Sequence, residues 1–216
     1  GIMEHIERAG VHSGDSMAVY PPQRMSQKVQ DEIVDAALKL AGALKTIGIM
    51  NVQFVIHDNK AYVIEVNPRA SRTVPFISKV TGVPMTQLAT AVMLGAKLSD
   101  SGYKTGLVAH HGKIHVKSPV FSFSKLPGVD SLLAPEMKST GEVMGSATTY
   151  GEALARAFAG AKMHVPSSGL VVIALNHRDH QEASELIAHL QTAGYKLLLD
   201  AGTAEFVEQP ELAASN

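Results

Sequence analysis

The chain has 216 residues, enough for one large domain or two small ones. Its residues are 45% hydrophobic and 18% charged, as in proteins that bury a core, and its formal net charge of −1 gives no electrostatic basis for binding nucleic acid or an anionic membrane. With no cysteine, disulfides, thiol catalysis and cysteine-bound zinc are excluded. No apolar run approaches the roughly 18 residues of a membrane span. We therefore expect a cytoplasmic protein with no nucleic-acid or membrane partner.

The beginning of the chain combines small residues with a histidine. Gly10–Ser16 could bring its backbone close to a ligand, although by itself the pattern is also typical of an ordinary turn. Ser26 is a suitable N-cap for a helix over Gln27–Thr46, which Gly48 ends. Apolar residues recur through this helix at helical spacing, from Ile33 to Ile47, and indicate a core-facing stripe.

A strand–turn–strand pattern follows the first predicted helix. Two apolar runs flank the polar residues His57–Lys60, and side chains alternate along a strand. A loop of about three residues predicts Phe54 opposite Ile64 and Gln53 opposite Glu65.

Between the hairpin and residue 169 the pattern predicts helices and one strand. We predict helices over Val74–Val80, Pro84–Leu94 and Tyr150–Ala161, a loop over Ser99–His111, a strand over Lys113–Phe123, a turn at Pro127–Asp130 and a linker at Pro166–Gly169.

The pattern changes after the linker. Leu170–Leu175 is a continuous apolar run that predicts a strand buried on both faces. An amphipathic helix over Asp179–Thr192 and a strand over Tyr195–Asp200 complete a parallel βαβ unit. We expect an α/β (α+β) chain with two domains, residues 1–165 and the beginning of a parallel-sheet domain over residues 166–216.

Oxygen-bearing side chains gather at the predicted hairpin. Gln53, Glu65 and Asn67 would share one face, and Mg²⁺ prefers oxygen ligands of this kind. Arg69 and Arg72 follow as permanently charged groups suited to phosphate or carboxylate oxygens. The pattern favours a metal–phosphate site. The alternative is structural: a buried Glu65 could instead hydrogen-bond its own turn.

Four stretches resemble one family. Ala9–Ser16, Met50–Phe54, Ile64–Phe76 and Pro135–Gly145 are similar to the ATP-grasp fold of carbamoyl phosphate synthase large subunits. The resemblance covers roughly residues 1–160 and implies the carboxyl-terminal lobe of the second, carbamate-phosphorylating half, with an antiparallel sheet and helices. The stretch from Gly169 resembles the beginning of the methylglyoxal-synthase-like regulatory domain of these subunits.

The resemblance also implies roles for individual residues. It assigns Gln53, Glu65 and Asn67 as ligands of Mg²⁺ or Mn²⁺. It places ATP against Gln53 and Glu65 and against a pocket lined by Gly10, Val11, His12 and Ser13. Arg69 and Arg72 would be catalytic, holding phosphate and the carbamate-derived group.

The whole enzyme implied by the resemblance makes carbamoyl phosphate, for pyrimidine and arginine biosynthesis, from bicarbonate, glutamine-derived ammonia and two ATP. Its partners would be a glutaminase small subunit and the rest of the large subunit. The chain reads as a piece of such a subunit, and we expect it to be inactive alone. Two alternatives remain: another ATP-grasp ligase, such as a biotin-carboxylase-like enzyme, and a non-catalytic regulatory or interaction module. The Arg69–Phe76 run and the regulatory beginning argue against the former.

Overall fold

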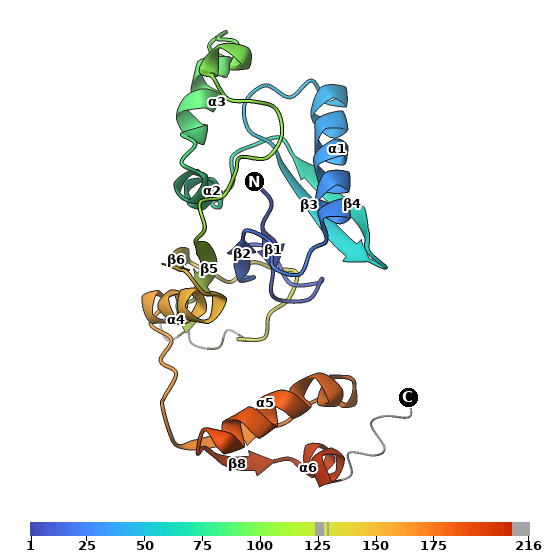
Figure 1. The fold of residues 1–216 in the computed structure, drawn as a ribbon, viewed down its shortest axis with the longest axis vertical. Coiled ribbons are helices and arrows are strands. Elements are labelled where there is room, and N and C mark those ends of the chain that lie inside the picture. The colour runs from blue at the N-terminus through green and yellow to red at the C-terminus, as the bar shows by residue number, and fades with distance from the viewer. Residues whose placement is uncertain (124–127, 129, 209–216) are drawn as a thin grey trace. The chain divides into compact units, whose positions relative to one another are not determined.

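A computed structural model of the chain describes residues 1–123, 128 and 130–208. The chain divides into two compact units, Gly1–Met163 and His164–Asn216. The first unit contains antiparallel strands and helices, and the second contains a parallel strand pair with helices. The mixed α/β class expected from the sequence is therefore confirmed (Figure 1).

A four-stranded antiparallel sheet lies at the centre of the first unit. Its order is β1 (Glu4–His5), β2 (Ala18–Tyr20), β5 (Ile114–Val120) and β6 (Gly141–Ala147). The sequence pattern predicted β5 alone, within Lys113–Phe123. The other three strands are too short or too rich in small and polar residues to show a strand period. Pairing with a neighbouring strand makes them strands: β2 and β6 pair with β5, and β1 pairs with β2.

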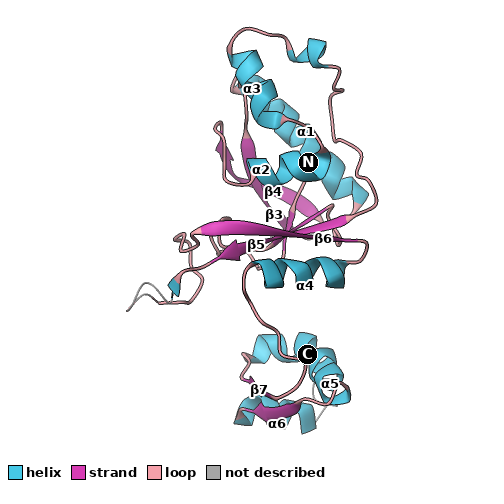
Figure 2. Cartoon of the chain, turned by 90° about the vertical axis from the view of Figure 1, so that its left-hand side faces the viewer, coloured by secondary structure: helices cyan, strands magenta, loops and turns pink. Residues whose placement is uncertain are grey.

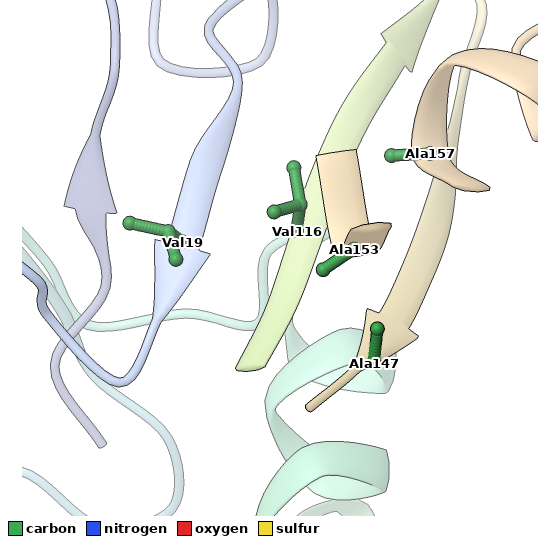
Figure 3. Close-up of a cluster of buried hydrophobic side chains, with 5 residues drawn as sticks. All are labelled: Val19, Val116, Ala147, Ala153 and Ala157. Carbon is green, nitrogen blue, oxygen red and sulfur yellow. The ribbon is translucent and has the colours of Figure 1, made fainter. Parts of the chain in front are cut away.

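Helix α4 (Tyr150–Gly160) covers one face of this sheet. It begins where the Thr149 side chain accepts a hydrogen bond from the backbone N–H of Glu152. Figure 3 shows the alanines of α4 directed at the strands. Together they form a buried cluster of small and β-branched side chains: Val19, Val116, Ala147, Ala153 and Ala157. Small side chains at the contact let the helix backbone approach the sheet closely.

Helix α1 (Gln27–Ala43) lies along the hairpin strands (Figure 1). The Ser26 hydroxyl caps it as predicted, but the helix ends three residues earlier than the pattern indicated. Ile33 is buried, whereas Leu44 and Ile47 are exposed. The predicted core stripe is therefore core only in its first part.

The hairpin consists of β3 (Asn51–His57) and β4 (Lys60–Asn67), joined by a two-residue turn rather than the predicted three. Both turn residues, Asp58 and Asn59, have positive φ, of 48° and 56°, a conformation that Asp and Asn tolerate. The short turn shifts the pairing by one residue, and a bulge after Gln53 absorbs the difference.

Because of the bulge, the predicted register holds on one side of Gln53 and fails on the other. Gln53 faces Glu65 as predicted, but Phe54 pairs with Val63 instead of Ile64. The predicted pairing is therefore right at the open end of the hairpin and wrong towards the turn.

Two helices follow the hairpin, close to their predicted bounds: α2 (Val74–Thr81) and α3 (Met85–Met93). Phe76 and Val80 of α2 pack with Tyr20 in a second buried cluster. Figure 2 shows α2 and the hairpin on the side of the β5–β6 strands away from α4. A short 3-10 helix at Leu98–Ser101 lies where a loop was predicted. The predicted turn at Pro127–Asp130 lies outside the described residues, apart from 128 and 130.

The second unit is built on two parallel strands, β7 (Leu170–Ile173) and β8 (Lys196–Leu199). Helix α5 (His180–Thr192) connects them, after a 3-10 turn at His177–Asp179, and α6 (Ala201–Glu208) follows β8. The parallel βαβ arrangement predicted from the sequence is present.

One face of this strand pair is open. Leu170, Val172 and Leu198 are 62%, 68% and 55% exposed, whereas the alternate residues Val171 and Ile173 are half-buried. The prediction that this strand is buried on both faces is therefore wrong for this chain, because helices cover a single face.

Across residues 1–123, 128 and 130–208, no helix has both the length and the apolar character needed to cross a membrane.

Candidate nucleotide and metal site

The open end of the hairpin gathers four side chains that carry oxygen. Gln53 lies opposite Glu65 and Asn51 opposite Asn67, so all four project from one face of the strand pair. The Asn67 amide Nδ2 donates a hydrogen bond of 2.9 Å to Glu65 Oε1. Asn51 was missed by the sequence analysis, although the predicted register already placed it opposite Asn67.

The hairpin face has the donor set of a hard-cation site. Glu65 supplies a carboxylate, and Gln53 and Asn67 supply amide oxygens. Glu65 is exposed and the other two are half-buried. Glu65 is therefore not buried as the structural alternative supposed, although its carboxylate does accept the local hydrogen bond from Asn67. In the described part of the chain, no three His, Cys, Asp or Glu side chains form a metal-binding group, so a cation here would depend on amide oxygens beside one carboxylate.

The Gly10–Ser16 segment is folded around the His12 imidazole. His12 Nδ1 accepts a hydrogen bond of 3.0 Å from the Gly14 backbone N–H, and its carbonyl accepts one of 2.9 Å from the Asp15 N–H. Because Nδ1 is an acceptor here, the neutral ring carries its proton on Nε2. The side chain therefore presents an Nε2–H donor.

Asp15 anchors this segment to a distant part of the chain. Its fully buried carboxylate accepts hydrogen bonds from the backbone N–H groups of Lys138 (2.7 Å) and Ser139 (2.9 Å). Burial by itself would raise the pKa of Asp15. The hydrogen bonds from Ser139 and Lys138 outweigh burial and hold the pKa below its usual value. Asp15 could not be assigned a role from the sequence, because its partners come together only in the fold.

Arg72 joins the same cluster. Its Nη2 donates to the Ser139 hydroxyl (2.7 Å) and to the Gly14 carbonyl (3.4 Å), and its Nη1 donates to the Ser139 carbonyl (3.3 Å). The Ser139 hydroxyl in turn donates to the Gly14 carbonyl at 3.0 Å. Arg69 is exposed and donates to the carbonyl of its neighbour Ala70.

Lys117 lies on the sheet face opposite α4. Its side chain is 1% exposed, and Nζ donates to the Ser13 carbonyl (3.2 Å) and to Glu142 Oε1 (3.3 Å). Burial lowers the pKa of Lys117, and Glu142 partly offsets this effect. Neither residue was predicted as part of the site. Lys117 lies on a predicted strand and Glu142 on one that was not predicted, and nothing in the sequence pattern indicates that they meet.

The predicted site residues therefore form two clusters. Arg72 lies with the Gly10–Ser16 segment, and Gln53, Glu65 and Asn67 lie together at the hairpin end. The first cluster offers backbone groups, an imidazole donor and a guanidinium to an anionic ligand. The second offers oxygens to a cation. Together these are the groups that a metal–polyphosphate ligand requires.

Residues 2–101 match a family model described as the ATP-binding domain of the carbamoyl-phosphate synthase L chain. This stretch includes both the Gly10–Ser16 segment and the hairpin.

The fold is similar to those of solved enzymes. N5-carboxyaminoimidazole ribonucleotide synthetase from Thermus thermophilus is 16% identical, with a TM-score of 0.51, over 76% of this chain and 46% of the synthetase. A single-chain, multi-domain long-chain acyl-CoA carboxylase is 16% identical, with a TM-score of 0.54, over 93% of this chain and 23% of the carboxylase. The chain spans less than half the length of either. At these identities the likeness shows the fold alone, a mixed α/β fold.

Proposed function

We propose that the first unit is the nucleotide-binding part of an ATP-grasp ligase that, in its whole enzyme, uses ATP with Mg²⁺ or Mn²⁺ to phosphorylate carbamate, as carbamoyl phosphate synthase does. The observation that carries this proposal is the hairpin face on which Gln53, Glu65 and Asn67 project together, within the stretch that matches the ATP-binding domain. The resemblance of Arg69–Phe76 to carbamoyl phosphate synthase large subunits supports carbamate as the substrate.

Each cluster has a role in this proposal. Gln53, Glu65 and Asn67 would hold the divalent cation, which supplies charge neutralisation for the ATP phosphates when bound. Gly10, Val11, His12 and Ser13 would line the nucleotide pocket, with His12 donating from Nε2 to an oxygen of the nucleotide.

The arginines would act on the transferred group. Phosphoryl transfer depends mainly on positioning the reactants and neutralising charge on the phosphoryl oxygens. Arg69 is exposed beside the hairpin end and would hold the phosphate oxygens. Arg72 is hydrogen-bonded to the Gly10–Ser16 segment and would hold the carbamate-derived group next to that segment.

Calorimetric titration of the chain with ATP, with and without Mg²⁺, tests the nucleotide proposal. We expect Glu65→Gln to remove the Mg²⁺ dependence and to weaken MgATP binding by roughly tenfold or more, because the amide keeps the shape but not the charge. Glu185→Gln, an exposed substitution in the second unit, is the matched control. Unchanged MgATP binding in Glu65→Gln, or a loss of melting temperature matching the loss of affinity, would contradict the role of Glu65.

A biotin-carboxylase-like ligase is the second candidate, supported by the fold likeness to the long-chain acyl-CoA carboxylase. Binding of phosphonoacetamide or biotin to the MgADP-loaded chain distinguishes the two candidate functions. We expect phosphonoacetamide, a stable analogue of carbamoyl phosphate, to bind, and Arg69→Ala to weaken it without changing MgADP affinity. Binding of biotin, with none of phosphonoacetamide, would favour the carboxylase.

The remaining assignments concern the whole enzyme. We propose residues 1–165 as part of the ATP-grasp domain and residues 166–216 as the beginning of a methylglyoxal-synthase-like regulatory domain, in a cytoplasmic enzyme with a glutaminase small subunit. Co-purification of the full-length subunit with a glutaminase checks the partner. A full-length subunit active with ammonia and bound to no glutaminase would contradict it.

A further inference from the structure

The buried ion pair of Lys117 and Glu142 is not used by the mechanism above. The two residues lie diagonally across the β5–β6 pair, because Lys117 pairs with Met144 and Glu142 lies two positions away from it on β6. The lysine is 1% exposed and the glutamate side chain 12% exposed. A buried ion pair is a weak source of stability, since apolar side chains of similar size often serve as well. Its presence therefore calls for another explanation.

The second hydrogen-bond partner of Lys117 supplies that explanation. Nζ also donates to the Ser13 carbonyl, at 3.2 Å, from beneath the Gly10–Ser16 segment. The Ser13 carbonyl belongs to the peptide group whose N–H, that of Gly14, donates to His12 Nδ1. Holding the carbonyl therefore orients the same peptide plane that fixes the imidazole.

The neighbouring peptide group is held as well. Arg72 and the Ser139 hydroxyl both donate to the Gly14 carbonyl. Two charged donors thus bind adjacent carbonyls of the segment, Lys117 from the sheet and Arg72 from the residues after the hairpin. Apolar side chains in place of Lys117 and Glu142 could fill the space, but could not supply the donor to Ser13.

We propose that Lys117 is a positioning residue: through the Ser13 carbonyl it holds the Gly10–Ser16 segment in the conformation that binds nucleotide, and the contact with Glu142 holds its ammonium group in place. This inference rests on the proposed nucleotide function for its effect on affinity. Its effect on the segment itself is independent of any ligand.

A double substitution separates positioning from stability. Lys117→Met alone leaves Glu142 buried without its partner and is expected to lower the melting temperature. Lys117→Met combined with Glu142→Leu removes both charges and is expected to recover most of that loss. We expect the double variant nevertheless to show faster amide hydrogen exchange at Gly14 and Asp15, and MgATP binding weaker by roughly tenfold. Lys113→Met, an exposed lysine just before the same strand, is the control and should change neither.

Amide hydrogen exchange and MgATP affinity test different parts of the proposal. Unchanged exchange at Gly14 and Asp15 in the folded double variant would overturn the positioning role. Faster exchange with unchanged MgATP affinity would overturn the link to binding. If the unsubstituted chain binds no MgATP, the proposed function fails, and the exchange measurement still decides what Lys117 does to the segment.

Discussion

At the scale of single residues, Asp15 connects parts of the chain that are far apart in sequence. Its carboxylate satisfies two backbone N–H groups of the 138–139 stretch while its own N–H bonds the His12 carbonyl. A buried carboxylate with this number of donors favours its ionised form, which is why its pKa lies below the usual value of 3.8. The residue thus stabilises the Gly10–Ser16 segment only while it is charged.

This charge dependence gives a pH prediction. Because the pKa of Asp15 is lower in the folded chain than in the unfolded one, its contribution to stability is complete above the unfolded value of 3.8 and is lost as the pH falls through the folded value. We expect Asp15→Asn to reduce the free energy of unfolding by about 1–3 kcal/mol at pH 7. The difference should shrink below about pH 4.

Thermal unfolding of both proteins between pH 7 and pH 2 measures this difference. The difference between the unsubstituted chain and Asp15→Asn separates the pH effect of Asp15 from that of Glu7. Burial raises the pKa of Glu7 despite opposing backbone hydrogen bonds from Glu7 itself and Met17, so its contribution has the opposite sign. A constant difference over the whole pH range would contradict the role of the Asp15 charge.

At the scale of elements, the contact between α4 and the sheet depends on one glycine. A Cβ at Gly145 of β6 would overlap the Ala153 carbonyl oxygen and the Ala157 nitrogen, both backbone atoms of α4. Backbone atoms of a helix cannot rotate away as a side-chain end can. Gly145 therefore sets how closely the helix lies on the sheet, and the alanines of α4 complete the contact.

We therefore expect Gly145→Ala to be strongly destabilising. Overpacking of a core typically costs about 1–3 kcal/mol, and here we expect about 3 kcal/mol or more because α4 itself must move. Urea unfolding followed by far-UV circular dichroism measures it. Gly141→Ala, in the same strand, is the control, since its Cβ would meet only Val120 at 3.9 Å. Equal effects of the two substitutions would show that α4 is not fixed by this contact.

At the scale of the whole molecule, the two units differ in how their strands are covered. The β5 and β6 strands have α4 on one face and the Gly10–Ser16 segment near the other. The β7–β8 pair exposes Leu170, Val172 and Leu198 on one face. A two-stranded sheet with an open apolar face is marginal in water.

We therefore expect the amide hydrogens of β7 and β8 to exchange faster than those of β5 and β6. Exchange followed by mass spectrometry at several protein concentrations measures this directly. Protection of β7 and β8 that rises with concentration would mean that a second copy covers the open face. Equal protection of both strand pairs at every concentration would show that the second unit is stable as it stands.

The sequence by itself determined the local elements and the chemistry of the hairpin. Helical spacing, the Ser26 cap and the apolar runs place α1, α2, α3, α4 and the βαβ unit, because these signals arise from neighbours within a few residues. Alternation along strands also placed Gln53 opposite Glu65 at the open end of the hairpin. Which face a side chain lies on depends only on whether its position in the strand is odd or even.

Only the tertiary structure decided the rest. The strands β2 and β6 exist because β5 offers them backbone partners, and β1 exists because β2 does. The bulge after Gln53 exists because the two-residue turn imposes a different register. The contacts of Asp15 with Lys138 and of Lys117 with Ser13 join residues more than a hundred positions apart. Periodicity describes which face a side chain lies on, but it carries no information about which distant segment that face will meet, so these contacts required the folded chain.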